Sequence, residues 1–333
     1  MAAGIVEYES AVPWEGFLAE PIGGPAAAGV LVLSGSSGRI ERERCRLFAR
    51  AGATAMSIRW FGGPGQPSGI REVALETFVA AIALLRERGS ERVGVLGVSK
   101  GAEAALLVST VSDCADAVIA LAPTSVVWAA VGSGRNRRER PCRSGWTWQG
   151  RPLPFVPYDE SWQPTEPEGA PVSVLGWYER SLAAHPDRLA AATIPVDRTT
   201  ADLVLIAGGA DRMWPSTRFA HELADRYAAT GREAALISRP DAGHRTVFPG
   251  EVPPPPSTRF DHGGTPEADA ELGAAAWPTV RATILGSRPP AGKAGTKRIG
   301  RSPSHSQWCG VGEVRARRGN SVVWSPRVSR RYV

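Results

Sequence analysis

The stretch that decides the fold is residues 92–112, RVGVLGVSKGAEAALLVSTVS, in which a short apolar run passes directly into a helical pattern. The run Arg92–Leu96 is typical of a parallel strand that is buried on both faces, and Gly101–Ser112 predicts a helix. The residues between them, Gly97 to Gly101, fit the pattern G-x-S-x-G. A serine on a tight turn between a strand and a helix is the setting of a nucleophile elbow. We therefore expect the Ser99 hydroxyl to project at the carboxyl edge of a sheet.

The same alternation of apolar runs and helical patterns continues on both sides of this stretch. The predicted strands are Val30–Leu33, Thr54–Ile58, Arg92–Leu96, Ala117–Ala122, Leu203–Ala207 and Ala234–Ser238. The predicted helices are Ile40–Ala51, Val73–Arg88, Gly101–Ser112 and Pro266–Leu285. Strands that alternate with helices form βαβ units, which predicts an α/β fold with a mostly parallel central sheet and helices on both faces.

Two segments depart from this alternation. Residues 126–181 contain five of the eleven tryptophans and many prolines, which favours a packed insertion that covers the strand ends. Residues 287–333 contain eleven Lys and Arg but a single acid, Glu313, so their net charge is +10. Since the whole chain has a net charge of +6, residues 1–286 have a net charge of −4. We expect 1–286 to be one catalytic domain and 287–333 to be a basic, disordered tail. With the excess charge confined to the tail, we expect no nucleic-acid partner.

The remaining composition argues against several other classes of protein. No zinc-ligand or redox spacing occurs among the cysteines, so we expect neither a metal site nor a disulfide framework, and nothing indicates a cofactor. These cysteines are Cys45, Cys114, Cys142 and Cys309. The first residues show no leader pattern and no run approaches 18 apolar residues, so the expected location is the cytoplasm, without a membrane partner.

A serine hydroxyl becomes a nucleophile only when a base removes its proton, and the base needs an orienting acid. In this type of fold the chain order is serine, then acid, then histidine, each after a strand. Asp211 follows the strand Leu203–Ala207 and His244 follows Ala234–Ser238, so Ser99, Asp211 and His244 are the predicted triad. The alternative acids are less well placed, because Asp202 begins a strand and Asp241 precedes the histidine too closely. The other histidines are assigned surface or structural positions: His185, His221, His262 and His305.

An oxyanion site also follows from the elbow. The backbone N–H of Lys100 lies at the start of the helix, where N–H groups face a developing negative charge. A second donor is expected from the loop Ser34–Gly38 after the first predicted strand, either from Ser36 or from Ser37. The side chain of Lys100 is expected to pair with Glu103 on the first helical turn.

Several stretches together resemble a known family. They are Val93–Glu103 with its Ser-Lys-Gly-Ala-Glu elbow, Ile194–Val196, Ala210–Ser216 with Asp-x-x-Trp-Pro-Ser, Ala242–His244, and Gly263–Glu267 leading into Trp277. Spread over about Gly16 to Leu285, they resemble the C-terminal catalytic domain of acyl-CoA thioesterases and bile acid-CoA:amino acid N-acyltransferases. The resemblance implies an α/β-hydrolase fold, Ser99 as nucleophile, Asp211 as acid and His244 as base, and an acyl-CoA thioester as substrate.

The sequence departs from that family at two points. Animal members carry a β-sandwich domain before the catalytic one, whereas about fifteen residues precede the first family-like strand here, as in a bacterial-type member without that domain. The members that conjugate amino acids use Cys as the nucleophile. A serine acyl-enzyme is an oxygen ester, for which water is the expected acceptor, so Ser99 favours hydrolysis over N-acyl transfer.

Other readings of the chain stay open at this point. A basic run could meet the phosphates of CoA or simply form a solvated loop face; it contains Arg135, Arg137, Arg138, Arg140 and Arg143. A carboxylesterase or a dienelactone-type hydrolase would share the triad and act on oxygen esters. A protein that binds without catalysis could also use this fold.

Overall fold

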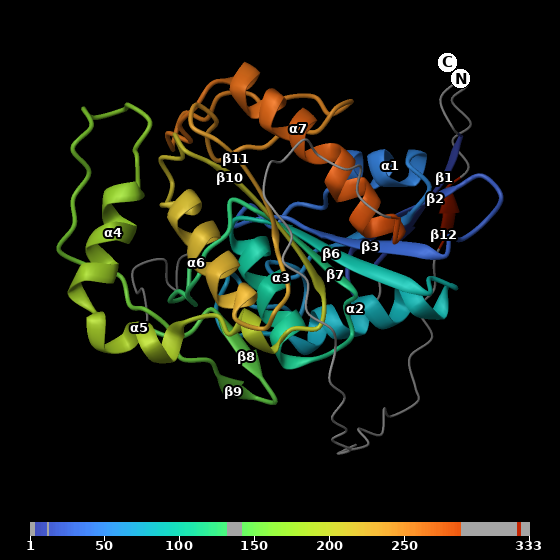
Figure 1. Ribbon diagram of the computed structural model, residues 1–333, viewed down its shortest axis with the longest axis horizontal. Helices are drawn as coiled ribbons and strands as arrows, with labels where there is room; N and C mark the ends of the chain where they lie inside the picture. The colour runs from blue at the N-terminus through green and yellow to red at the C-terminus, as the bar shows by residue number, and fades with distance from the viewer. Residues whose placement is uncertain (1–3, 12, 132–141, 288–324, 328–333) are drawn as a thin grey trace.

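A nine-stranded sheet forms the centre of the molecule in a computed structural model that describes residues 4–11, 13–131, 142–287 and 325–327 (Figure 1). Its strand order is β11-β10-β7-β6-β3-β4-β2-β1-β12. Six neighbouring strands of this sheet run parallel to one another: β3 (Ala28–Leu33), β4 (Thr54–Ile58), β6 (Arg92–Val98), β7 (Ala117–Leu121), β10 (Asp202–Gly208) and β11 (Ala235–Arg239). The mostly parallel sheet predicted from the sequence is confirmed.

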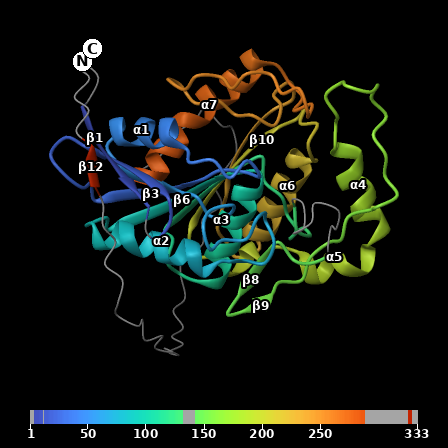
Figure 2. The same ribbon diagram turned by 180° about the vertical axis from the view of Figure 1, so that it is seen from behind.

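Helices cover both faces of this sheet (Figures 1 and 2). One face packs against α1 (Arg42–Arg50) and α7 (Pro266–Leu285), and the other against α2 (Glu76–Glu87), α3 (Lys100–Val111) and α6 (Ser216–Ala228). In β3, Val30 and Val32 belong to the hydrophobic core on the face covered by α1 and α7. Leu31 and Leu33 belong to the core on the opposite face. Successive side chains of a strand point to opposite faces, so burial on both sides explains the uninterrupted apolar runs.

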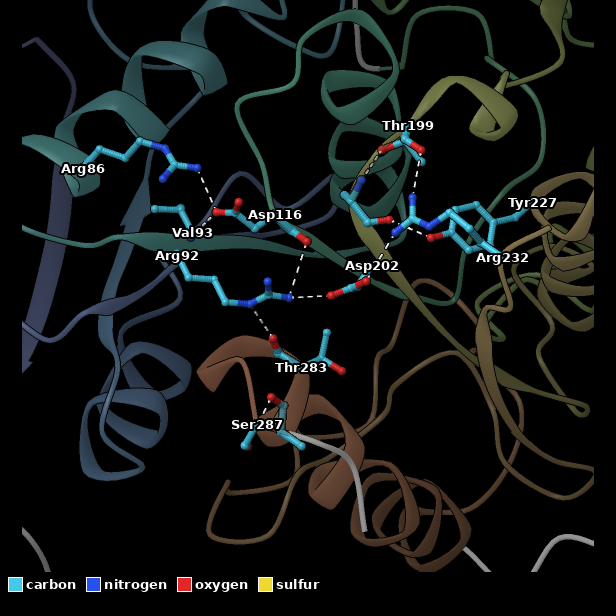
Figure 3. A network of polar contacts seen from close by, with 12 residues as sticks. Arg86, Arg92, Val93, Asp116, Thr199, Asp202, Tyr227, Arg232, Thr283 and Ser287 are labelled. Carbon is cyan, nitrogen blue, oxygen red and sulfur yellow. Dashed lines mark hydrogen bonds and ion pairs between the residues drawn. The ribbon is translucent and has the colours of Figure 1, made fainter. Parts of the chain in front are cut away.

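The amino ends of the parallel strands are held by ion pairs (Figure 3). Asp202, the first residue of β10, accepts hydrogen bonds from Arg92 at 2.6 Å and from Arg232 at 3.3 Å. Asp116, just before β7, accepts one from Arg86 at 2.8 Å. These charges therefore lie at the edge of the sheet opposite to the nucleophile elbow, which follows the carboxyl end of β6.

The Trp-rich insertion has its own core. It contains β8 (Trp146–Trp148), β9 (Arg151–Pro152) and most of α4 (Leu175–Ala184), and α5 (Pro186–Ala192) and the short 3-10 helix η1 (Val196–Arg198) follow it. Trp128 packs edge-on against Tyr178, with ring centroids 4.7 Å apart, and Tyr178 packs against Trp214 at 5.3 Å. Trp214 belongs to the loop after β10, so the insertion packs against that loop.

The predicted helix Val73–Arg88 is wrong at its first turn. Val73–Ala74 forms a short strand, β5, that pairs with β8, and the helix begins only at Glu76. The Val73 N–H donates to the Gly145 carbonyl at 2.8 Å, so a partner from the insertion, about 70 residues away, competes with the helical pattern.

The central sheet also contains three strands that the apolar runs did not predict. β1 (Ile5–Ser10) and β2 (Gly16–Pro21) form an antiparallel pair that joins the sheet beside β4. β12 (Ser325–Arg327) pairs with β1, while the rest of the expected tail after Ser287 lies outside the described residues.

The start of α3 gives a first testable prediction. A Cβ atom at Gly101, the second residue of α3, would lie 2.4 Å from the carbonyl oxygen of Ser34 and 2.7 Å from that of Leu33. At Gly176, the second residue of α4, a Cβ would meet only the indole nitrogen of Trp162, at 3.4 Å. We expect Gly101→Ala to lower the free energy of unfolding by about 2–3 kcal/mol, because backbone must move. Gly176→Ala should leave it unchanged or raise it by up to about 1 kcal/mol.

Urea unfolding of the two variants beside the parent protein measures this difference. Equal effects of the two substitutions would contradict the close approach of α3 to β3.

Candidate active site

Ser99 lies on a strained turn between β6 and α3. Its φ of 56° and ψ of −119° are rare for a residue with a side chain, and such backbone costs on the order of 1–3 kcal/mol. A Cβ at Gly97 would lie 2.0 Å from the carbonyl oxygen of Gly101, so only glycine fits there. Ser99 itself is partly exposed, although its neighbours Gly97 and Lys100 are buried. The turn thus presents the Ser99 side chain at the carboxyl edge of the sheet.

Asp211 and His244 are in direct contact. His244 Nδ1 lies 2.8 Å from Asp211 Oδ2, and both residues are about 5% exposed. The other carboxylate oxygen, Oδ1, accepts the backbone N–H groups of Met213 at 2.8 Å and Trp214 at 3.3 Å. An ionised carboxylate only accepts hydrogen bonds, so Nδ1 donates and Nε2 is left as the basic nitrogen.

The strand order places these residues at the same edge as Ser99. β6, β7, β10 and β11 are neighbours and parallel, so their carboxyl ends meet there. The Ser99 N–H donates to the carbonyl of Leu121 at the end of β7, at 2.9 Å. Next to Leu121, the carbonyl of Ala122 accepts the indole N–H of Trp214 at 3.1 Å. The Trp214 ring packs edge-on against His244, with centroids 5.9 Å apart.

The two alternative acids do not contact His244. Asp202 is engaged by arginines at the opposite edge of the sheet. Asp241 pairs with Arg239 at 3.1 Å and its side chain is 55% exposed. Of the three acids weighed from the sequence, the structure brings only Asp211 to the imidazole.

His262 lies beside His244, which the sequence did not indicate. Its carbonyl accepts the His244 N–H at 2.9 Å, and the two rings are 6.0 Å apart. Burial lowers the pKa of His262 to about 4, and the nearby charge of Arg245 and the ring of His244 act in the same direction. His262 is therefore neutral at physiological pH, and its described contact with the His244 backbone supports the loop.

The loop expected to hold the second oxyanion donor packs against the elbow. Gly35 to Gly38 form a turn in which the Gly38 N–H donates to the Gly35 carbonyl at 3.2 Å, and Ser36 and Ser37 are exposed on it. A Cβ at Gly35 would lie 3.2 Å from the Cβ of Ser99. A side chain at Gly35 would be crowded against Ser99, a contact that the sequence did not indicate. On the other side of the serine, the Lys100 N–H is in the first turn of α3, where N–H groups have no partner within the helix.

The side chains of Lys100 and Glu103 form the expected ion pair, but it is buried and extends further than the sequence indicated. Lys100 Nζ lies 2.7 Å from Glu103 Oε2, and the two side chains are 2% and 0% exposed. Burial lowers the pKa of Lys100, and the Glu103 carboxylate counteracts this. Glu103 Oε1 also accepts the backbone N–H of Trp128 at 2.9 Å and the indole N–H of Trp146 at 2.8 Å. One carboxylate therefore joins the elbow helix to two points of the insertion.

The predicted phosphate-binding run falls mostly outside the described residues, which exclude Arg135, Arg137, Arg138 and Arg140. The neighbouring Arg143 is described and pairs with Glu72 at 3.2 Å. Within the described ranges, no three His, Cys, Asp or Glu side chains are arranged to hold a metal ion. No helix in the same ranges is long and apolar enough to cross a membrane.

A cavity of about 620 Å³ lies between α4, α5 and α6. Its apolar lining includes Leu182, Leu189, Phe219 and Leu223, and charged residues of α6 and η1 surround them. None of Ser99, Asp211 and His244 lines it. The cavity is therefore separate from the candidate triad.

Comparison with known proteins identifies relatives by sequence. A family model described as "BAAT / Acyl-CoA thioester hydrolase C terminal" matches residues 73–282. "Acyl-coenzyme A thioesterase 2, mitochondrial" of Mus musculus is 24% identical over 220 residues, which cover 65% of this chain and 44% of the relative. "Acyl-coenzyme A thioesterase 6" of Mus musculus is 24% identical over 264 residues, covering 76% and 58%. The chain thus spans about half the length of the curated relatives it matches.

Solved structures agree on the fold. A Klebsiella pneumoniae protein assigned as a dienelactone hydrolase has a TM-score of 0.50 at 14% identity, with 84% of this chain and 98% of that chain covered. A puromycin-hydrolyzing peptidase of Mycobacterium tuberculosis has a TM-score of 0.50 at 16% identity, with 86% and 40% covered. Both similarities concern the architecture alone.

Proposed function

Because the chain belongs to the BAAT / acyl-CoA thioester hydrolase C-terminal family and is a hydrolase, we propose that it cleaves acyl thioesters, above all acyl-CoA, into a free acid and CoA. The observation that supports this most is the contact of His244 Nδ1 with Asp211 Oδ2 at 2.8 Å, on the sheet edge where the elbow presents Ser99. A base that is oriented by an acid and lies beside a serine is the arrangement that such a reaction needs.

In the proposed first half-reaction, Ser99 Oγ attacks the thioester carbonyl carbon and passes its proton to His244 Nε2. The oxyanion accepts the backbone N–H of Lys100 and one N–H from Ser36 or Ser37. When the tetrahedral species collapses, the carbon–sulfur bond breaks and the thiolate of CoA takes the proton from His244. CoA leaves as a thiol and the acyl group stays on Ser99 as an oxygen ester.

In the second half-reaction, His244 removes a proton from a water molecule, which attacks the acyl-enzyme. Collapse of this second tetrahedral species breaks the ester bond, returns the proton to Ser99 and releases the carboxylic acid. An oxygen ester reacts less readily with amines than a thioester does, so we propose hydrolysis rather than transfer to an amino acid.

A panel of acyl-CoA esters of increasing chain length, compared with p-nitrophenyl esters of the same acids, tests the substrate class. Release of the CoA thiol with a higher kcat/KM than the matching aryl ester supports the proposal. Turnover of the aryl esters without release of CoA would instead favour the oxygen-ester hydrolase, the second candidate, whose support is the shared architecture with the dienelactone hydrolase structure.

A further inference from the structure

Asp269 is a buried carboxylate beneath the loop that bears His244. It lies in the first turn of α7 and is 6% exposed. Its Oδ1 accepts the backbone N–H of Gly243, the residue directly before His244, at 2.6 Å. Its backbone carbonyl accepts the N–H of Val247, three residues after His244, at 3.2 Å. Asp269 therefore holds the loop on both sides of the histidine.

The surrounding backbone leaves this loop little room to move. A Cβ at Gly243 would lie 2.1 Å from the carbonyl oxygen of Gly263, and one at Gly264 would lie 2.2 Å from the nitrogen of Gly243. A Cβ at Gly273, one turn further along α7, would lie 1.7 Å from the carbonyl oxygen of Val247. Because backbone packs against backbone at these points, the Asp269 carboxylate stays at a fixed place relative to His244.

The charged and titratable groups that act on Asp269 come from two loops. His244 and Arg245 lie on the loop after β11, and Asp211 lies on the loop after β10. Burial raises the pKa of Asp269 to about 6, although the Gly243 N–H and His244 lower it in part. Asp269 is consequently ionised at neutral pH and becomes protonated a little below it.

We propose that Asp269 is a positioning residue, which holds the His244 loop through Gly243 and whose negative charge stabilises the imidazolium formed when His244 takes the proton of Ser99. This inference rests on the proposed roles of Ser99 and His244. A negative charge near an imidazole favours the protonated ring, which is the form present in the transition state. Asp211 orients the ring through Nδ1, and Asp269 adds charge from beneath the loop.

The proposal has a consequence for the pH dependence of the rate. The negative charge of Asp269 favours the protonated ring of His244, both in the transition state and in the resting protein. A substitution that removes this charge should therefore lower the plateau rate and also move the acid limb of the profile to lower pH.

The rate of inactivation by a fluorophosphonate measures this pH dependence without any thioester substrate. Ser99 Oγ attacks phosphorus, fluoride leaves, and the serine proton passes to His244, so the rate reports the serine and its base alone. We compare the parent protein, Asp269→Asn and Asp116→Asn between pH 4.5 and 9. Asn keeps an oxygen that accepts the Gly243 N–H. Asp116 is the matched control, since it also accepts a backbone N–H, that of Val93 at 2.7 Å, at the opposite sheet edge.

We expect Asp269→Asn to show an acid limb displaced to lower pH by up to about one unit and a plateau lower by up to about tenfold, the factor that one pKa unit represents. Asp116→Asn should keep the shape of the parent profile. If Asp269→Asn and the parent protein have the same limb and plateau, the carboxylate only anchors the loop and the proposal is overturned.

Asp269→Ser is a second variant for the case that Asp269→Asn does not fold, because it also removes the charge and carries an oxygen that can accept a hydrogen bond. A displaced acid limb and a lower plateau in Asp269→Ser support the proposal, and the limb and plateau of the parent protein overturn it. Absence of labelling in the parent protein would remove the proposed serine mechanism, and this inference with it. Labelling with an unchanged profile would overturn only the role of Asp269.

Discussion

Ser99→Ala is expected to lower kcat for acyl-CoA hydrolysis by about 10⁴-fold or more, because no other group at the elbow can form the acyl-enzyme. The oxyanion donors and the bound substrate remain, so a small residual rate above the uncatalysed reaction should persist. The substitution removes one hydroxyl from a partly exposed side chain, so the free energy of unfolding should change little.

Release of CoA thiol measures the loss, and the mass of the intact protein after fluorophosphonate treatment measures labelling. Ser112→Ala is a suitable control, because Ser112 lies at the far end of the same helix α3 and away from the elbow. Equal labelling of Ser99→Ala and the parent protein would show that another residue is the nucleophile.

Asp211→Asn is expected to lower kcat by about 10⁴-fold, through the tautomer of His244 rather than through packing. The oxygen Oδ1 accepts two backbone N–H groups, so the amide oxygen of the new Asn occupies that position and its NH₂ faces His244. An NH₂ donates to Nδ1 and forces the ring proton onto Nε2. The ring then has no basic nitrogen for the proton of Ser99.

The rival acids serve as matched controls for this substitution. Asp241→Asn and Asp202→Asn should keep kcat near that of the parent protein, because both carboxylates are held by arginines away from His244. Loss of activity in Asp241→Asn together with normal activity in Asp211→Asn would show that Asp241, and not Asp211, is the acid that orients His244. Steady-state acyl-CoA hydrolysis and circular dichroism of the three variants separate chemistry from folding.

The sequence was sufficient for the parallel strands and for placing the candidate residues after the carboxyl ends of those strands. Strands such as β3 and β7 are buried on both faces, so their apolar runs are continuous and easily recognised. Asp211 and His244 follow such strands in the expected order, and the sheet order then determines where they lie. Asp202 was set aside because it begins a strand, and Asp241 because it precedes His244 too closely in the sequence.

Features that depend on distant partners were not predictable in this way. β1 is only partly buried and contains glutamates, so its alternation is weak. The strand β5 depends on pairing with the insertion. Asp269 is an acid in the first turn of a helix, where acids are common because they favour the helix dipole, so its sequence position gave no sign of burial. Its contact with Gly243 spans 26 residues and arises from close packing of glycines.

The buried carboxylate of Glu103 also bears on how such a chain can diverge. It accepts hydrogen bonds from Trp146 and Trp128 of the insertion and pairs with Lys100 of the elbow helix. Removing one partner of a buried ion pair typically costs about 3–5 kcal/mol, a large part of the stability of a domain. Relatives should therefore keep or replace these residues together, so that the length of the insertion can vary in its loops while its two anchoring tryptophan positions are inherited with the helix that follows the serine.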